Sequence, residues 1–359
     1  MLSITTAQAQ DLLTFWLPRQ EIPLYAGPPG CGKSAMIEEV ATVHLPRITG
    51  HPWKCYIFHP ATHDPTYYGG FPWLWTDPET KQPHAQLITM SEFGDLVDTD
   101  EHIVAFFDDF GHAPKSVQAT LMQPFHARRL NRKRIGPNVS FAVATNRRGD
   151  KAGVEGVIAP ILSRCRVCDI RPDLDSFLHR YWYPNNRPEE VAGYLRFRPD
   201  HLYLEKKTSD IENTPCYRTW DMVGRDLRGG IPYGLELPTY AASVGEGVAG
   251  EFNTYLRVYK EMPDPDYDIA HPTKAKVPEN LSVLHAWCTA LAYRTTVETF
   301  PAIAQLITKV SKSGPHGREE IAISLFSDAG KRCPQIVGLP ACDELANGPL
   351  GELTLPSLS

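Results

Sequence analysis

The stretch "IPLYAGPPGCGKSAMIEEV", residues 22–40, places the strongest constraint on the fold of this chain. Its centre, "GPPGCGKS" at residues 27–34, carries glycine, lysine and serine at every required position of the phosphate-loop pattern. An apolar run precedes the loop, and the residues after it have the apolar spacing of a helix. A strand, a glycine-rich loop and a helix in this order predict a site in which backbone N–H groups and the positive end of the helix bind phosphate.

Each part of this loop has an expected role. The glycines allow the backbone to turn so that its N–H groups point inward, Lys33 reaches the terminal phosphates, and Ser34 ligates magnesium. The predicted nucleotide-binding residues are Gly27, Pro28, Pro29, Gly30, Cys31, Gly32, Lys33 and Ser34.

Further apolar runs predict buried strands of the same sheet. "HIVAFFDDF" (102–110) is apolar up to Asp108 and Asp109, and "VSFAVAT" (139–145) is followed by Asn146. A short strand at 55–58 precedes them, and a helix that begins at Pro114 lies between them. Strands that alternate with helices predict an α/β fold with a mostly parallel sheet sandwiched by helices, whose ligands bind beyond the carboxyl ends of the strands.

Four residues near those strand ends are candidates for metal binding or catalysis. Asp108 is placed to hold the water shell of magnesium, and Asp109 to orient an attacking water. The amide of Asn146 would contact the γ-phosphate and that water, or else Asn146 is an ordinary turn residue. Arg164 follows a short helix and suits stabilisation of transition-state charge in a neighbouring subunit, or else it is a helix-end cation.

Helical periodicity dominates the chain after about residue 172. The predicted helices span 174–182, 188–195, 218–228, 239–260, 281–295, 299–311 and 317–330. Gly245, Gly247 and Gly250 predict either close helix packing or a kink within the fourth of these. We predict a nucleotide-binding α/β domain at 1–172, a helical lid domain at 173–262, a linker at 263–280, and a helical C-terminal extension with a loosely held tail at 281–359.

Composition argues against several classes of protein. The net charge of −6 provides no overall positive field for indiscriminate binding of nucleic acid. No uncharged apolar run approaches the roughly 20 residues of a membrane-spanning helix. The eight cysteines are mostly scattered and no signal-peptide pattern precedes them. These features predict a soluble protein of the cytoplasm.

The ordered set "GPPGCGKS", "AFFDDF", "VATN", "LSRC" and "TPCYRTW" resembles the AAA+ ATPases, and among them the MoxR-like branch. The resemblance includes "DPTYYGGFP", "VQATLMQPFHARRLN" and "ASVGEGVAGEFNTYL", covers roughly residues 20–260, and is greatest to members encoded by tailed bacteriophages and prophages. It implies that ATP and Mg²⁺ bind between the subunits of a ring, usually a hexamer, and that hydrolysis moves parts of the ring against a client macromolecule. For a phage-encoded member, the compartment is the host cytoplasm.

The resemblance also implies roles for individual residues. Carried over by position, the phosphate-loop pair is Lys33 and Ser34, the magnesium acid is Asp108, the first sensor is Asn146, the finger supplied in trans is Arg164 and the second sensor is Arg218. Whether Arg218 acts on its own subunit or on the next is left open, and Arg166 is an alternative finger.

Two departures from the pattern of the family bear on the rate of hydrolysis. Asp109 stands where glutamate is usual, and because it is one methylene shorter it would displace the catalytic water. Tyr217 stands where proline is common before the second-sensor arginine. Slow turnover is therefore one of the expectations.

Two segments are candidates for contact with a client. "WLWT" (73–76) and "AQLI" (85–88) predict a hairpin around "DPETKQ", near the place where the resemblance implies an insertion that faces the central pore. Trp73 and Trp75 either pack under this hairpin or lie exposed and contact a partner. The run "ARRLNRKR" (127–134) is the most basic cluster, and a solvated loop or a contact between subunits is favoured over a pore for nucleic acid.

Three functions are consistent with these features. The preferred one is a ring-forming, chaperone-like ATPase that remodels a protein client, and the resemblance implies a protein with a von Willebrand factor A domain as one expected partner. The second is an ATP-gated assembly scaffold that hydrolyses slowly, suggested by Asp109. The third is a DNA-acting motor, suggested by the run at 127–134.

Overall fold

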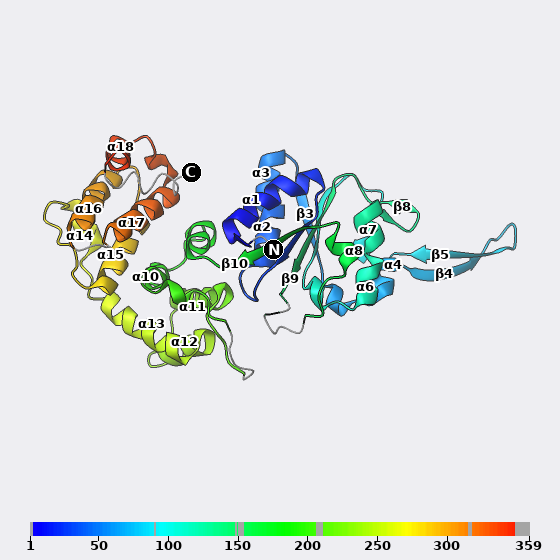
Figure 1. The fold of residues 1–359 in the computed structure, drawn as a ribbon, viewed down its shortest axis with the longest axis horizontal. Helices are drawn as coiled ribbons and strands as arrows, with labels where there is room; N and C mark the ends of the chain where they lie inside the picture. Colours follow the sequence, from blue (N-terminus) through cyan, green and yellow to red (C-terminus); the bar gives the residue numbers. More distant parts are fainter. Residues whose placement is uncertain are drawn as a thin grey trace. The chain divides into compact units, whose positions relative to one another are not determined.

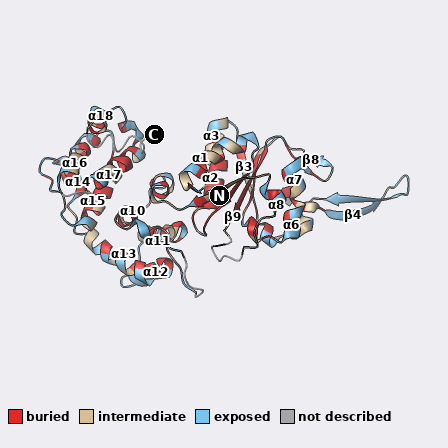
Figure 2. Cartoon of the chain, in the orientation of Figure 1, coloured by how far each residue is buried: buried red, intermediate tan, exposed pale blue. Residues whose placement is uncertain are grey.

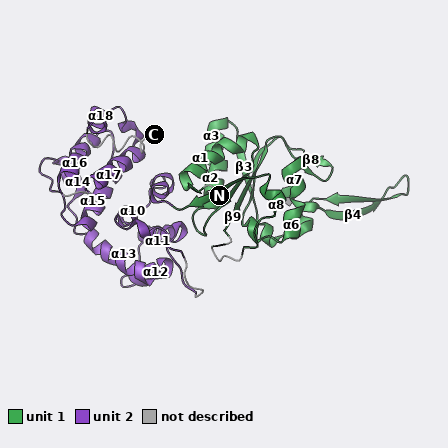
Figure 3. Cartoon of the chain, viewed as in Figure 1, with its two compact units in different colours: residues 1–172 green, residues 173–359 purple. Residues whose placement is uncertain are grey.

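The computed structural model describes residues 3–89, 91–147, 149, 154–205, 211–314 and 318–348. The chain divides into two units, Met1–Pro172 and Asp173–Ser359 (Figure 3). All strands of the described residues belong to the first unit, and the second is helical (Figure 1). Of the C-terminal segment 338–359, which was expected to be loosely held, residues 349–359 lie outside the described residues, whereas Pro340–Ala346 form a helix in which Cys342 and Leu345 are buried.

A six-stranded parallel sheet forms the centre of the first unit. Its strands, in spatial order, are β1 (Ser3–Thr5), β10 (Arg166–Arg171), β2 (Pro23–Ala26), β9 (Val139–Thr145), β6 (His102–Phe107) and β3 (Trp53–Phe58). β9 lies between β2 and β6, although it follows both in the sequence. The residues that follow these three strands therefore meet at one edge of the sheet, and the predicted α/β fold is confirmed.

The central strands are buried on both faces because their side chains alternate between two apolar clusters. In β6, Ile103, Ala105 and Phe107 face one cluster, whereas Val104 and Phe106 face the other. Figure 2 shows this burial as red strands between the helices of the first unit. A near-continuous apolar run is what a parallel strand covered on both sides requires.

Helices cover both faces of the sheet. α1 (Thr6–Trp16), α2 (Lys33–Glu39) and α3 (Leu45–Thr49) pack on one face. The other face carries α4 (Pro65–Gly69), α5 (Ser91–Gly94), α6 (Lys115–Thr120), α7 (Met122–Ala127) and α8 (Ala159–Leu162). The helix predicted from Pro114 is divided at Leu121 into α6 and α7, because Pro124 has no N–H to donate to the carbonyl of Thr120.

Two antiparallel hairpins complete the first unit. One pairs β4 (Phe71–Thr76) with β5 (Pro83–Ile88), and the other pairs β7 (Arg129–Leu130) with β8 (Lys133–Arg134). All residues of β4 and β5 are exposed, and Figure 1 shows the two strands extending away from α4 and α6. The hairpin prediction is confirmed, and Trp73 and Trp75 are 55% and 41% exposed rather than packed beneath it.

The second unit contains ten helices among its described residues. Their bounds are α9 (Leu174–Ser176), which continues as a π-helical turn Phe177–Trp182, α10 (Glu189–Phe197), α11 (Tyr217–Gly229), α12 (Glu236–Val244), α13 (Glu246–Tyr259), α14 (Pro265–Ala270), α15 (Leu281–Tyr293), α16 (Phe300–Lys312), α17 (Arg318–Arg332) and α18 (Pro340–Ala346). The helix predicted at 239–260 is interrupted by Gly245, whose φ of 79° no helix accommodates. The glycines there mark a kink, since a Cβ on Gly247 or Gly250 would meet no described atom within 4 Å.

α15 belongs to both apolar cores of the second unit. Ala286 lies in the core built from α10, α11 and α13, and Trp287 lies in the core of α16 and α17. The segment 263–280, expected as a linker, contains α14, where the buried Asp268 accepts a hydrogen bond from Trp287 Nε1 at 2.9 Å. Its prolines and charges suggested a linker, but tertiary packing gives this segment fixed contacts.

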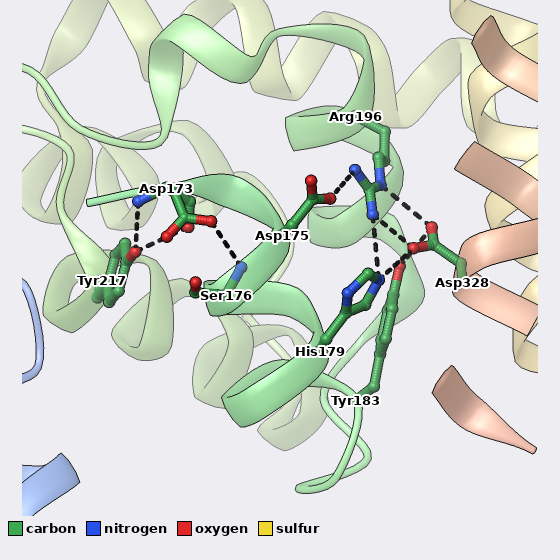
Figure 4. A network of polar contacts seen from close by, with 8 residues as sticks. All are labelled: Asp173, Asp175, Ser176, His179, Tyr183, Arg196, Tyr217 and Asp328. Carbon is green, nitrogen blue, oxygen red and sulfur yellow. Dashed lines mark hydrogen bonds and ion pairs between the residues drawn. The ribbon is translucent and has the colours of Figure 1, made fainter. Parts of the chain in front are cut away.

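A polar network joins α10, the π-helical turn and α17 (Figure 4). Arg196 donates to both carboxylate oxygens of Asp328, at 2.5 Å and 3.1 Å, and to Asp175 at 2.7 Å. His179 Nε2 lies 2.7 Å from Asp328 Oδ1, and the Tyr183 hydroxyl donates to Oδ2 at 2.8 Å. Residues predicted for the lid are thereby bonded to a helix predicted for the C-terminal extension.

Asp328 is charged although its side chain is only 3% exposed. Burial acts to raise the pKa of its carboxyl, but the neighbouring Arg196 and His179 lower that pKa to about 2. The buried negative charge is therefore matched by bonded partners, which is the condition for burying a charge at all.

No helix among the described residues has both the length and the apolar character that crossing a bilayer requires.

Candidate functional site

The predicted phosphate loop connects β2 to α2, and its glycines are required by the backbone. A Cβ on Gly27 would lie 3.0 Å from the carbonyl oxygen of Ile170, so the loop passes β10 too closely for a side chain. Gly30 and Gly32 have φ angles of 75° and 86°, which glycine adopts without steric penalty. Gly32 directly precedes α2. The predicted order of strand, loop and helix is confirmed.

The other loop residues have no titrating role in this arrangement. Pro28 is buried and Pro29 is exposed. Cys31 is buried against the sheet, and burial raises the pKa of its thiol. Cys31 therefore remains a neutral side chain that packs beneath the loop.

Lys33 carries its charge into the centre of the loop. Its side chain is buried, and Nζ donates to the carbonyl oxygens of Gly27 at 2.8 Å and Pro28 at 2.9 Å. A third bond, of 3.0 Å, reaches Oδ1 of Asn146 at the end of β9. The cation is thus held by neutral acceptors with no carboxylate bonded to it, and a phosphate would be a stronger partner than any of them.

Ser34 and Asp108 form the second pair of the site. Ser34 Oγ donates to Asp108 Oδ2 at 2.5 Å, and the backbone N–H of Asp108 donates to the carbonyl of Phe58 at 2.9 Å. The pair places a hydroxyl beside a carboxylate, and both are oxygen ligands of the kind Mg²⁺ takes. Because Mg²⁺ is usually bound by one or two carboxylates together with phosphate oxygens, these two residues fit a magnesium nucleotide. The described residues contain no group of three or more His, Cys, Asp and Glu side chains suited to a metal ion.

Thr145 connects three strand ends and was not singled out from the sequence. Its carbonyl accepts from the backbone N–H of Gly27 at 3.2 Å, and its hydroxyl accepts from the N–H of Gly111 at 3.1 Å. A Cβ on Gly111 would lie 2.3 Å from that hydroxyl, so the contact also requires a glycine. In the sequence, the only indication of this role is that Thr145 ends the apolar run directly before the candidate sensor Asn146.

Asp109 follows Asp108 but turns away from the loop. Its backbone is left-handed, with φ at 50°, and its side chain is 53% exposed. Its carboxylate lies 3.7 Å from His112 Nδ1, and no described hydrogen bond joins it to Lys33 or Ser34. The two neighbouring acids therefore have different surroundings, and only Asp108 is bonded into the phosphate site.

The arginines after α8 bond locally. Arg164 donates from Nη1 to the carbonyl of Pro160 and to Ser163 Oγ, while its Nε is buried with no partner among the described residues. Arg166 donates to Glu21 at 2.9 Å, and this hydrogen bond lowers the pKa of that carboxyl. In the described part of the chain, no hydrogen bond links Arg164 to its own phosphate loop.

Arg218 lies in the second unit, at the start of α11, and is exposed. The preceding Tyr217 is buried, and its hydroxyl donates to the carbonyl of Asp173 at 2.8 Å. The ring of Tyr217 also packs on Phe177, with the centroids 4.5 Å apart. The tyrosine that replaces the expected proline therefore ties the first residue of the second unit to α11 (Figure 4).

No family model and no curated protein sequence matches this chain. Among solved structures, it is similar to RuvB of Thermotoga maritima, described as a Holliday junction branch migration motor, at 14% identity over 89% of this chain and 80% of that chain, with a TM-score of 0.31. A variant of the same protein aligns at 14% identity over 95% of this chain and 82% of that chain, with a TM-score of 0.32. At such values, function has to be inferred from the residues of the site.

Proposed function

We propose that the protein is an AAA+ ATPase of the MoxR-like type, which assembles into a ring and uses ATP hydrolysis to remodel a protein client. The observation that carries the proposal is the meeting of Lys33, Ser34, Asp108 and Asn146 at the carboxyl edge of β2, β6 and β9. In an α/β sheet this edge, where the strand order departs from the sequence order, is where ligands bind.

The residues of the site divide the work of phosphoryl transfer among them. Lys33 supplies the cation for the terminal phosphates, because the neutral oxygens that hold it now are weaker acceptors than a phosphate. Ser34 and Asp108 supply oxygen ligands for Mg²⁺, whose chemistry is to neutralise charge that develops on the phosphates. Asn146 orients the attacking water, and Asp109 accepts its proton.

The surroundings of Arg164 support assembly of several copies of the chain. Because its hydrogen bonds are local and do not reach its own loop in the described residues, its charge suits the nucleotide of a neighbouring copy. In the same proposal, Arg218 acts as a further sensor of that nucleotide from the helical unit. A ring, expected to be hexameric, brings each nucleotide between two copies.

A protein client is supported by the exposed β4–β5 hairpin. Large apolar side chains that are exposed together mark sites of contact with another molecule. A partner with a von Willebrand factor A domain belongs to the same proposal.

Mixed rings test the proposal most directly. Arg164→Ala subunits and Lys33→Ala subunits should each hydrolyse ATP at less than a hundredth of the wild-type rate, about the loss expected when one charge-stabilising group is removed. Mixing the two should restore turnover, because some interfaces then combine an intact loop with an intact arginine. Phosphate release is the measurement. In the control, Arg164→Ala subunits are mixed in equal amount with subunits that carry both Lys33→Ala and Arg164→Ala, so that no subunit supplies an intact arginine. Failure of the mixture to exceed that control would refute the role in trans.

A slowly hydrolysing scaffold is a second candidate, favoured by the surroundings of Asp109. A carboxylate that is half exposed and faces His112 is poorly placed to activate water. ATP-dependent assembly, measured by sedimentation, with no Lys33-dependent phosphate release would establish the scaffold in place of the motor.

A further inference from the structure

The β4–β5 hairpin, residues 71–88, is apolar on both of its faces. Alternate residues share a face, so Phe71, Trp73 and Trp75 lie on one side and Leu74 on the other. Leu74 is 77% exposed and Phe71 55% exposed. Ile88, which pairs with Phe71, and Leu87, which pairs with Pro72 on the face of Leu74, are also exposed. An ordinary surface hairpin has one polar face that contacts water, whereas both faces of this hairpin expose apolar side chains.

A cationic turn lies at the base of this hairpin. The turn is the β7–β8 hairpin, residues 129–134, and its exposed cations are Arg129, Arg132, Lys133 and Arg134. Asn131, at the tip of the turn, donates from Nδ2 to the carbonyl of Gly69, two residues before β4, at 3.2 Å. Two segments about 60 residues apart in the sequence are thereby fixed side by side.

The acids near the turn leave most of its charge unpaired. Lys133 lies 4.0 Å from Asp98. Among the described residues, neither Arg129 nor Arg132 forms an ion pair, and both are exposed. The base of the hairpin is therefore positive in a chain whose net charge is −6.

We propose that the hairpin and the cationic turn together form one binding surface for an extended, acidic polypeptide segment, in which apolar side chains contact the hairpin and carboxylates contact the turn. Six strand residues span about 20 Å, so the apolar part of the segment is about six residues long. This inference rests on the proposed function and specifies the client segment as extended, with an apolar part and an acidic part.

The charges of the hairpin favour a polypeptide over single-stranded nucleic acid. Neither β4 nor β5 contains a lysine or an arginine, and the connecting residues 77–82 contain Asp77 and Glu79 against Lys81. If the bases of a single strand stacked along the aromatic face, its phosphates would run past Asp77 and Glu79 with Lys81 as the single cation of residues 77–82.

The test is a comparison of two labelled peptides that differ only in charge. Each has an extended apolar half, and the other half is rich in glutamate in one peptide and in lysine in the second. Fluorescence anisotropy of the wild-type protein without ATP should give at least tenfold tighter binding of the glutamate peptide, and added salt should reduce the difference. Because no nucleotide is present, a protein that binds as expected but does not hydrolyse ATP refutes only the proposed function.

Variants separate the two parts of the surface. Arg129→Ser with Arg132→Ser should bring the two peptides within about threefold of each other, whereas Trp73→Ser with Leu74→Ser should weaken both at least tenfold. Arg257→Ser, which removes an exposed cation from α13, is the matched control and should change neither. All substituted side chains are exposed, and unchanged circular dichroism spectra verify folding.

The opposite outcomes overturn the proposal. Equal binding of the two peptides, or insensitivity to the Trp73 and Leu74 substitutions, excludes the surface as described. Tighter binding of an oligodeoxythymidine than of the glutamate peptide, lost in the Arg129 and Arg132 variant, would assign the surface to nucleic acid. If the hairpin substitutions change self-association and leave peptide binding intact, the occupant is a second copy of the chain.

Discussion

The phosphate site of the first unit and the buried network of the second are both built from bonded charges, but the bonds differ in kind. Lys33 is held by carbonyl and amide oxygens, and Asp108 by a hydroxyl. Arg196 and Asp328, by contrast, are bonded to each other. One site keeps its cation apart from its acid, and the other joins them.

The difference separates a site that can accept a ligand from one that holds helices together. A cation with neutral partners forms stronger hydrogen bonds when a phosphate binds. A cation already bonded to a buried carboxylate would have to give up bonds of the same strength to contact a phosphate. The acids of the two sites also differ in exposure, since Asp328 is almost fully buried while Asp108 is only partly buried.

The largest test removes the unpaired cation. Lys33→Ala should lower ATP turnover by more than a hundredfold, or about 3 kcal/mol, because no other described cation is bonded within the loop. The same variant should unfold at nearly the wild-type denaturant concentration, since its bonds are to neutral groups. If Lys33→Ala unfolds as early as a variant of Asp328, the distinction between the two sites is wrong.

Breaking the paired charges should have the opposite effect. Asp328→Asn removes the buried carboxylate of Arg196 and leaves only the exposed Asp175 as its acid, which should lower the free energy of unfolding of the second unit by about 3 kcal/mol. Denaturant unfolding followed by tryptophan fluorescence measures the loss. Asp175→Asn is the control. Asp175 contacts the same arginine but its side chain is 70% exposed, so the substitution should lower the free energy of unfolding by less than about 1 kcal/mol.

Acid should weaken the network in a defined window. Because the folded pKa of Asp328 is about 2 and its ordinary value is 3.8, the carboxylate adds stability that is complete above pH about 4 and is lost as the pH falls towards 2. The shift corresponds to on the order of 2 kcal/mol. The difference in unfolding free energy between wild type and Asp328→Asn should shrink over this window, and a constant difference would contradict the assignment.

The smallest effect is expected at Asp109. Extending this carboxylate in Asp109→Glu should raise ATP turnover by a factor of about three, because the longer side chain would hold the attacking water more closely than the half-exposed Asp109 does. Asp108→Glu is the control and should lower turnover, since Asp108 is already bonded to Ser34. Slower hydrolysis by Asp109→Glu would show that the aspartate is the better fit to this site.

The two regions also differ in how far the sequence could predict them. The phosphate loop depends on local spacing, so Gly27 to Ser34 could be placed from the order of the residues alone, and the ends of β6 and β9 followed from apolar runs. The meeting of Asn146 with the loop followed from the rule that parallel strands end at one edge, whereas its bond to Lys33 was not predicted.

The network of Arg196 and Asp328 could not be predicted in this way. The two residues are 132 positions apart, and no spacing rule connects α10 to a helix so distant in the chain. The packing of the segment 263–280, expected to be a linker, was missed for a related reason. The hydrogen bond that Asp268 accepts comes from Trp287, which lies 19 residues further along the chain. Contacts set by tertiary packing leave no periodic trace in the sequence.

α15 has a consequence for shortened forms of the chain. Because this helix supplies Ala286 to one core and Trp287 to the next, a chain cut before residue 281 loses the second core and leaves apolar side chains of the first uncovered. Such a truncated protein should be recovered as insoluble aggregate.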